Sequence, residues 1–286
     1  MTSPWITEDD VRERLDLRRA IDAVEAALAR EASGEAQTML KTHVGWGEGH
    51  TLHAIGGVDG DLVGTKTWAH TAGGANPLLI LWDSETGERR AVIEAFLLGQ
   101  LRTAAMSGVA TRLLADPSTS VVAVIGSGKQ AGPQVDALRA VLPVEEVRVF
   151  SPDPAHRTAF AERVDAIACG SVEAAVDGAG VITTATRATK AFLSSAMVET
   201  GAHVNAIGAI TPERAEVAAD LVHRSLLVTD SVESAMRLAR EVADRDLRPL
   251  SSLVGQARPS VDVTVFKAMG IGLADVALGR AILEGE

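Results

Sequence analysis

The sequence has a single cysteine, Cys169, among 286 residues, so it cannot form an internal disulfide. This is consistent with a reducing compartment, and Cys169, beside Gly170, is expected to be a small buried apolar residue. No apolar run approaches the roughly 20 residues that cross a bilayer. The first residues also lack the basic and then apolar order of a secretory signal. We therefore expect a cytoplasmic protein with no membrane association.

Basic residues are scarce as well. There are 27 Lys and Arg against 38 Asp and Glu, which gives a net charge of −11 and argues against a nucleic-acid partner. The histidines show no close ligand spacing such as His-x-x-x-His, so no metal site is expected. Ser127 does not lie in a Gly-x-Ser-x-Gly turn with triad partners, which argues against a hydrolase.

The order of predicted helices and strands differs between the two parts of the chain. Apolar residues recur at helical spacing over 17–28, and four short β-type runs with glycine-rich turns follow; these features predict a helix and antiparallel strands. A helix is expected at 96–115. After it, strand-like runs alternate with helical segments, which predicts a doubly wound parallel sheet. The runs are 121–125, 147–150, 181–184, 203–207 and 226–229.

The expected fold class is therefore α/β, with a Rossmann-type parallel sheet and a second, α+β domain. We expect the nucleotide domain at 117–260. The other domain, for substrate binding and dimerisation, is expected to comprise 1–116 joined by the tail 261–286, which begins β-like and ends helical.

A glycine-rich turn carries the strongest functional signal. The buried-strand pattern Val121–Ile125 leads directly into Gly126-Ser127-Gly128-Lys129-Gln130-Ala131, where a helix begins. Gly126 permits a tight turn, Gly128 lets a pyrophosphate approach the backbone, and Ala131 is the small residue where helix meets strand. Free N–H groups and the helix dipole then face the phosphates. Because the turn lies between a strand and a helix, it predicts a bound NAD(P).

The choice between NAD and NADP depends on the end of the next strand. An NAD site usually has an acid there, which binds the ribose hydroxyls. Here Ser151 stands in that place, with Arg157 nearby, and a hydroxyl plus an arginine suits a 2′-phosphate. We therefore favour NADP. NAD is the alternative, because an acid, Asp153, follows two residues after the position where an NAD site usually has one.

Several segments together resemble the ornithine cyclodeaminase/mu-crystallin family. The resemblance implies a homodimer that uses NAD(P) to interconvert small amino acids with imino or keto acids, or to cyclise ornithine or lysine. The segments are Gly64-Thr65-Lys66, Asp83–Gly87, Arg102-Thr103-Ala104-Ala105, Ile125–Ala131, Thr184-Ala185-Thr186 and Asp262–Gly270.

The resemblance also assigns roles. Lys66 matches a lysine that contacts the substrate and transfers a proton, Arg102 matches the arginine that holds the substrate carboxylate, and Thr103 matches a cofactor-phosphate contact. An arginine suits a carboxylate because its planar fork pairs bidentately. His53 is a further candidate at the substrate pocket. Residues matching those around the ribose and nicotinamide are Thr184, Ala185, Thr186, Ile207, Gly208, Ala209, Met269 and Gly270.

Two positions depart from the family pattern. Lys41 stands where the family often has a second carboxylate-binding arginine. Ile210 replaces an aspartate two residues before a proline, and an apolar side chain cannot act as a base. This favours reduction of an imine or cyclic ketimine carboxylate. The alternatives are an amino-acid dehydrogenase or cyclodeaminase, and a non-catalytic NADP-dependent binding protein. Glu216 is interpreted as a solvated helix charge.

Overall fold

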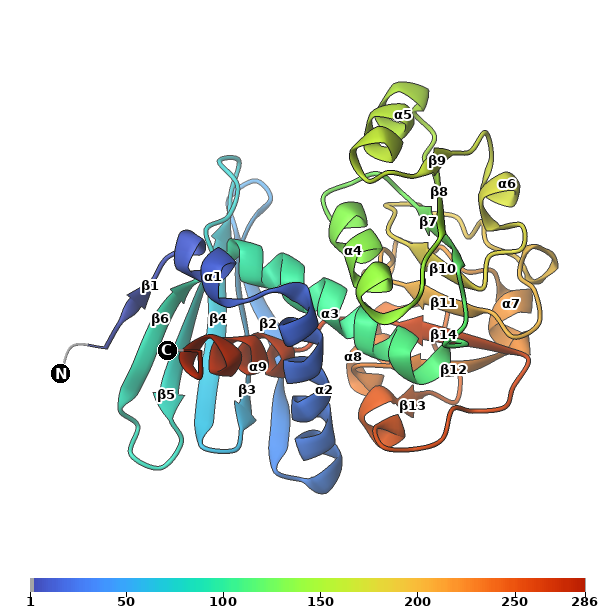
Figure 1. Ribbon diagram of the computed structural model, residues 1–286. Coiled ribbons are helices and arrows are strands. Elements are labelled where there is room, and N and C mark those ends of the chain that lie inside the picture. The colour runs from blue at the N-terminus through green and yellow to red at the C-terminus, as the bar shows by residue number, and fades with distance from the viewer. Residues whose placement is uncertain (1–2, 286) are drawn as a thin grey trace. The chain divides into compact units, whose positions relative to one another are not determined.

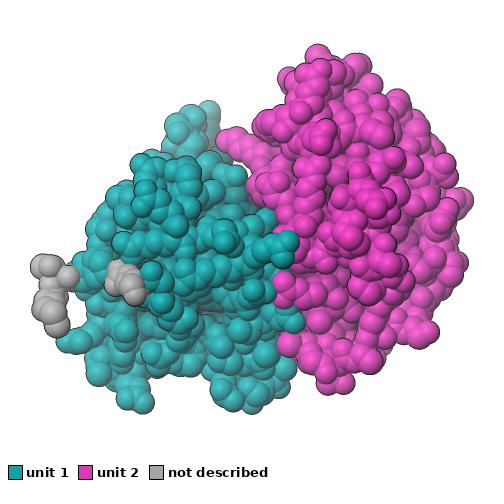
Figure 2. All heavy atoms as spheres, in the orientation of Figure 1, with its two compact units in different colours: residues 1–106, 270–286 teal, residues 107–269 magenta. Residues whose placement is uncertain are grey.

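The computed structural model describes residues 3–285, which form two compact units (Figures 1 and 2). Unit 1 comprises residues up to 106 together with those from 270 onward, and unit 2 comprises residues 107–269. The units divide at 106/107 and 269/270, whereas the sequence predicts boundaries at 116/117 and 260/261. Residues 107–114 form the second half of a long helix and belong to unit 2, and residues 263–267 supply a strand of its sheet.

Unit 1 is built on a six-stranded sheet in the order β1-β6-β5-β4-β3-β2. The predicted antiparallel pairing is confirmed from β3 to β6. The strand β2 also pairs antiparallel with β3, and β1 pairs with β6 in parallel. The strand β2 was not foreseen, because its mostly exposed residues give no apolar alternation. The strands are β1 (Trp5–Ile6), β2 (Ala36–Trp46), β3 (His50–Asp59), β4 (Leu62–His70), β5 (Leu78–Asp83) and β6 (Arg89–Glu94).

Two helices, α2 (Leu17–Ser33) and α9 (Gly272–Leu283), pack on one face of this sheet (Figure 1). A Cβ on Gly279 would collide with the side chains of Leu79 and Leu81 in the sheet, so this glycine allows the close packing of α9. Asp16 caps the start of α2, and Gly34 ends it in the left-handed region at φ 83°. The helix α1 (Glu8–Arg14) precedes α2, and α3 (Phe96–Leu114) follows the last strand.

Unit 2 contains the predicted parallel sheet, with eight strands in the order β13-β12-β14-β11-β10-β7-β8-β9. Its strands are β7 (Val121–Ile125), β8 (Glu146–Phe150), β9 (Ile167–Ala168), β10 (Val181–Thr184), β11 (His203–Ala206), β12 (Ser225–Thr229), β13 (Arg248–Pro249) and β14 (Val263–Lys267). Its helices after α3 are α4 (Ala131–Val141), α5 (Pro154–Arg163), α6 (Val172–Val176), α7 (Ala219–Arg224) and α8 (Val232–Leu238), with short 3-10 turns at Ser195–Met197 and Leu250–Leu253.

Apolar cores lie on both faces of the unit 2 sheet. In β7, Val122 and Val124 belong to one core and Ala123 and Ile125 to the other, as the alternation of a strand requires. The strand β14, from the end of the chain, lies between β11 and β12, and all five of its residues are buried. Within residues 3–285 we find no helix with the length and apolar character needed to span a membrane.

Candidate active site

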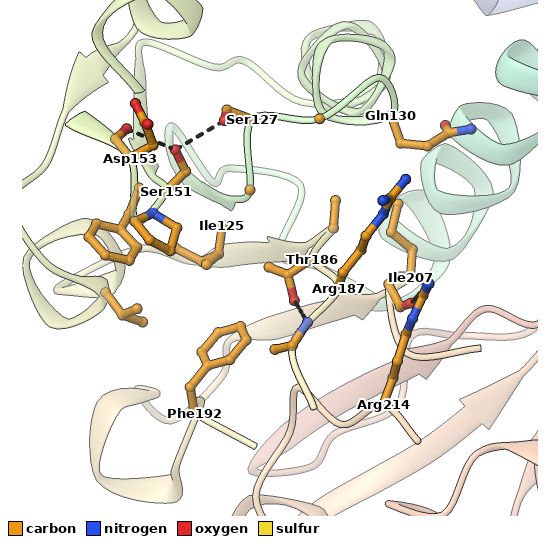
Figure 3. Close-up of a pocket in the computed structure, with 18 of the residues that line it drawn as sticks. Ile125, Ser127, Gln130, Ser151, Asp153, Thr186, Arg187, Phe192, Ile207 and Arg214 are labelled. Atoms are coloured by element: carbon orange, nitrogen blue, oxygen red, sulfur yellow. Dashed lines mark hydrogen bonds between the residues drawn. The ribbon is translucent and has the colours of Figure 1, made fainter. Parts of the chain in front are cut away.

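A pocket of about 1060 Å³ lies at the carboxyl edge of the unit 2 sheet (Figure 3). Its wall includes the whole run from Ile125 to Gln130, which follows β7. Segments after three further strands complete it: Ser151 to Asp153 after β8, Ala185 to Lys190 after β10, and Ile207, Gly208 and Ile210 after β11. This is the place where open α/β sheets bind their ligands.

The glycine turn has the geometry that a dinucleotide needs. Gly126 adopts a φ of 119°, and a Cβ there would lie 2.6 Å from the carbonyl oxygen of Ala185. A Cβ on Gly128, by contrast, would have no described atom within 4 Å, so its side of the turn is open. The helix α4 begins directly afterwards at Ala131, with its N-terminal N–H groups at the turn. The residues present therefore fit a pyrophosphate.

The charge of the pocket supports the same ligand. Four cationic side chains line it, Lys129, Arg187, Lys190 and Arg214, against a single acid, Asp153. This excess of positive charge occurs in a chain whose net charge is −11. Because most of the molecule repels anions, the concentration of cations at one pocket indicates an anionic ligand. Figure 3 shows Arg187 and Arg214 on the side of the pocket opposite Ser151.

Ser151, at the end of β8, has a hydrogen-bond partner in the glycine turn. The Ser127 hydroxyl donates to the Ser151 hydroxyl at 3.0 Å, which joins the glycine turn to the next strand (Figure 3). Asp153 caps α5, and its carboxylate accepts from the His156 N–H at 2.8 Å. Arg157 donates to the Ser151 carbonyl at 2.7 Å and lies over the Phe150 ring, outside the pocket lining.

The residues assigned to the cofactor divide into those that line the pocket and those that are buried behind its wall. Ala185, Thr186, Ile207 and Gly208 line it, with Ile210 beside them. The buried residues behind the wall are Ala131, Thr184 and Ala209. Met269 packs partly buried against the core of unit 2, with its N–H bound to Asp230.

Glu216 is the clearest error of the sequence interpretation. It lies in the loop before α7 and is fully buried, not solvated. Its carboxylate accepts hydrogen bonds from the segments that follow β10 and β11. A lone acid among apolar residues, in Ala215-Glu216-Val217, was the available signal.

In unit 1, Lys66 and Arg102 converge on a buried acid. The Lys66 Nζ lies 2.5 Å from Asp275 Oδ1, and the Arg102 Nε lies 3.7 Å from the same oxygen. Lys66 comes from β4, Arg102 from α3 and Asp275 from α9. Asp275 Oδ2 is buried with no hydrogen-bond partner among the described residues, so the two cations are the charge partners of this carboxylate.

The surroundings of Lys66 adjust its acidity. Burial is the largest influence and lowers the pKa of Lys66 to about 8, with Arg102 and Lys41 acting in the same direction and Asp275 opposing them. Burial, and then Arg102, also lower the pKa of Lys41. The ammonium of Lys66 can therefore release its proton near neutral pH.

Aromatic rings complete this cluster. His53 stacks on Trp68 with centroids 4.8 Å apart, and the Nζ atoms of Lys41 and Lys66 lie 5.4 and 5.6 Å from the Trp68 ring. Burial, and then the charge of Lys41, lower the pKa of His53 to about 4, so the ring is neutral at pH 7. Its Nε2 bonds the Thr51 hydroxyl at 2.8 Å. The structure thus brings all four predicted substrate residues into unit 1: Lys41, His53, Lys66 and Arg102.

Two other predicted cofactor residues belong to unit 1. Thr103 donates from its hydroxyl to the Gly99 carbonyl at 3.0 Å. Gly270 has a φ of 83°, and a Cβ there would lie 2.5 Å from a terminal nitrogen of Arg102. The backbone at Gly270 therefore packs against the guanidinium and limits where Arg102 can lie.

Sequence reasoning missed Asp275, although a signal was present. It is the only charged residue in the first eight positions of α9, Gly272-Leu273-Ala274-Asp275-Val276-Ala277-Leu278-Gly279. A lone acid on a helix that is buried on every side needs a cationic partner. The sequence does not indicate which cation it meets.

Comparison with known proteins shows which family the chain resembles. A family model for the ornithine cyclodeaminase/mu-crystallin family matches residues 4–285. The chain belongs to this family. The match covers both units.

Individual members of the family support this assignment. The ketimine reductase mu-crystallin of Mus musculus is 32% identical over 72% of this chain and 68% of its own length. An alanine dehydrogenase of Archaeoglobus fulgidus is 28% identical over 98% of this chain and 94% of its own. Among solved structures, an archaeal alanine dehydrogenase dimer with bound NAD has a TM-score of 0.90 and 27% identity, and the match covers 100% of this chain and 96% of that one.

Proposed function

We propose that this protein is an NAD(P)H-dependent reductase of a small α-imino acid, either an open-chain imine or a cyclic ketimine carboxylate. The observation that carries the proposal is the cluster of Lys66, Arg102 and Asp275. It combines a carboxylate-binding guanidinium with an amine whose pKa is about 8. When bound, the nicotinamide supplies a hydride.

The side chains of unit 1 supply the remaining chemistry. Arg102 pairs with the substrate carboxylate and so fixes the adjacent imine carbon. Lys66 donates a proton to the imine nitrogen, which makes that carbon more electrophilic. Asp275 holds the Lys66 ammonium at 2.5 Å and directs its remaining N–H bonds. Lys41 adds a second positive charge near the carboxylate.

The charge balance of this cluster argues against diamino acids. The cluster contains three cations, Lys41, Lys66 and Arg102, and one acid, Asp275, which contacts the last two, while His53 is neutral. The terminal ammonium of ornithine or lysine would meet like charge there. Ile210 also puts an apolar side chain in the pocket wall where a base would be needed. Amino-acid oxidation remains the second candidate, because the alanine dehydrogenase similarity spans 98% of the chain.

A substrate panel tests the proposal. Cyclic and open-chain α-imino acids would be supplied with NADPH and with NADH, while cofactor absorbance and product amino acid are followed together. We expect oxidation of one cofactor per amino acid formed, and no ammonia from ornithine. Tight cofactor binding without turnover of any imine would instead indicate a binding protein.

The pH dependence of imine reduction should follow Lys66. Its pKa is lowered to about 8, so the proton that it donates is present below pH 8 and lost above it. We expect kcat/KM to be level from pH 6.5 to 7.5 and to fall about tenfold for each pH unit above the pKa. A pH–rate profile in a constant-ionic-strength buffer measures this. A profile that stays level up to pH 9.5 would contradict the role of Lys66.

We propose NADPH as the preferred cofactor. Ser151, not an acid, follows β8, and cationic side chains line the pocket. Asp153 already uses its carboxylate to cap α5. A Ser151→Asp variant should shift the ratio of kcat/KM values toward NADH by roughly tenfold or more, because a carboxylate repels a 2′-phosphate. Thr158→Asp is the control, because it adds the same charge at an exposed position of α5 outside the lining. Preference of the unmodified enzyme for NADH would refute the assignment.

We further propose a homodimer formed through the uncovered sheet face of unit 1. The side chains of β2 and β3 alternate, so Lys41 and His53 lie on the face covered by α9 while five exposed apolar residues lie on the other. These are Met39, Val44, Trp46, Leu52 and Val58. A patch of this kind is typical of a protein interface. The archaeal alanine dehydrogenase is itself a dimer.

A paired substitution tests the dimer. Val44 and Leu52 are direct partners in the β2–β3 register and are 60% and 44% exposed. The double variant Val44→Asp/Leu52→Asp should sediment as a monomer at micromolar concentrations, where the unmodified chain sediments as a dimer. Ile167→Asp, at an exposed apolar position of unit 2, is the control and should stay dimeric. A dimeric double variant would rule out this face.

A further inference from the structure

Glu216 carries more hydrogen bonds than its place in a connecting loop requires. Its side chain is fully buried, and both carboxylate oxygens are used. The donors to Oε1 are the N–H and the hydroxyl of Thr186, at 2.6 and 2.7 Å, and the donors to Oε2 are the Thr184 hydroxyl at 3.0 Å, the Gly208 N–H at 2.8 Å and the Ala209 N–H at 3.2 Å.

These five bonds join two neighbouring strand ends. Thr184 is the last residue of β10 and Thr186 follows it, while Gly208 and Ala209 follow β11, and the two strands pair in parallel. Thr186 and Gly208 both line the pocket. A Cβ on Gly208 would collide with the Thr186 backbone and with the Glu216 carboxylate, so only glycine lets the segments approach this closely. One carboxylate thus sets the spacing of two pocket walls.

The backbone of Glu216 is itself fixed in place. Its N–H donates to Glu241 Oε2 at 2.6 Å, and its carbonyl accepts from the N–H groups of Phe192 and Leu193, each at 3.0 Å. Glu241 in turn forms a buried ion pair with Lys267, at 2.8 Å, at the end of β14. A third strand end is therefore connected to the same acid.

We infer that Glu216 is the positioning residue for the cofactor, because it holds the segments after β10 and β11 at the separation that the nicotinamide half of a dinucleotide requires. The inference rests on the proposed function only in taking a nicotinamide dinucleotide as the ligand. Glu216 stands behind the wall and acts through Thr186 and Gly208, so it is not a catalytic residue.

A carboxylate suits this role because it only accepts hydrogen bonds. In Glu216→Gln the shape is kept, but one oxygen becomes an NH₂ group that faces N–H or hydroxyl donors. Two or three donors then lose their acceptor, and the two segments must move apart to relieve the contact. The variant should weaken cofactor binding by roughly tenfold or more, on the scale of one to three unsatisfied buried groups.

The test compares Glu216→Gln with Glu213→Gln, an exposed glutamate in the same loop. Three quantities are measured: the dissociation constants of NADPH and NADH without substrate, the KM values for cofactor and imine, and the melting temperature. We expect Glu216→Gln to raise the cofactor Kd and KM about tenfold, with the imine KM within twofold of the unmodified enzyme. Glu213→Gln should leave all three quantities unchanged.

A merely structural role gives a different result. The melting temperature and the active fraction would fall, while the cofactor Kd of the folded molecules would stay the same, and this outcome overturns the inference. If Glu216→Gln fails to fold, Thr184→Val removes one donor to the Glu216 carboxylate from behind the pocket wall, and Thr184→Ser restores it. The Kd should then rise in the first variant and recover in the second. Because these titrations contain no imine, failure of the proposed reaction leaves them interpretable.

Discussion

Replacing Lys66 with methionine is expected to lower kcat/KM for an imino acid by about 10³-fold while the cofactor Kd stays within twofold of the unmodified value. Methionine keeps the length of the buried side chain but has no proton to donate. The cofactor pocket lies wholly in unit 2 and Lys66 in unit 1, so binary binding should not change. Initial rates and fluorescence titration measure the two effects separately.

Loss of the Lys66 charge should also lower the stability of the fold. A second variant separates this loss of stability from the loss of catalytic activity. Asp275 is fully buried and keeps only the Arg102 Nε at 3.7 Å, so Lys66→Met should cost about 3–5 kcal/mol of unfolding free energy. The double variant Lys66→Met/Asp275→Asn removes the uncompensated charge and should recover most of that loss. Activity should stay low in both variants. Recovery of activity in the double variant would contradict the proton-donor role.

The second large effect is expected at the glycine turn, where two neighbouring glycines should respond differently. Gly126→Ala places a methyl group 2.6 Å from the Ala185 carbonyl oxygen at a φ of 119°. We expect it to destabilise unit 2 by about 3 kcal/mol and to abolish measurable cofactor binding. Thermal unfolding followed by circular dichroism, together with calorimetric titration of NADPH, measures both changes.

Gly128→Ala is the matched comparison. Its Cβ would meet no described atom within 4 Å, so the unfolding free energy should change by less than about 0.5 kcal/mol. The methyl group nevertheless occupies the space that a pyrophosphate needs, so the cofactor Kd should rise by about 100-fold. Unchanged affinity in Gly128→Ala would mean that the phosphates bind elsewhere.

Local patterns predicted most of the fold. The strand-turn-helix unit from Val121 to Val141 is confirmed, because its apolar run, its glycines and its helix all favour the same structure. Alternation and turns also predicted the antiparallel strands β3 to β6 of unit 1, but not β2. The strand β14 was placed in the wrong domain, because nothing local in Val263–Lys267 says that it enters the sheet between β11 and β12.

The contacts that the sequence did not predict join residues that are far apart along the chain. Lys66 and Asp275 are 209 positions apart, and Glu216 meets Thr184 across 32. Charge type alone made Glu216 resemble a surface residue, whereas its burial depends on five donors from two other segments. The resemblance to a family supplied Lys66 and Arg102, but it supplied neither of the acids that hold the two sites together.

Transfer of a labelled hydride tests the central claim most directly. The enzyme would be given NADPH deuterated at the transferring position of the nicotinamide together with Δ¹-pyrroline-2-carboxylate or an open-chain α-imino acid, and the amino acid formed would be examined by mass spectrometry. The proposed function predicts one deuterium at the α-carbon for each cofactor oxidised, and labelled product that forms about 10³-fold more slowly with Lys66→Met. Cofactor that stays reduced with every imino acid, alongside ammonia release from alanine or ornithine, would contradict it.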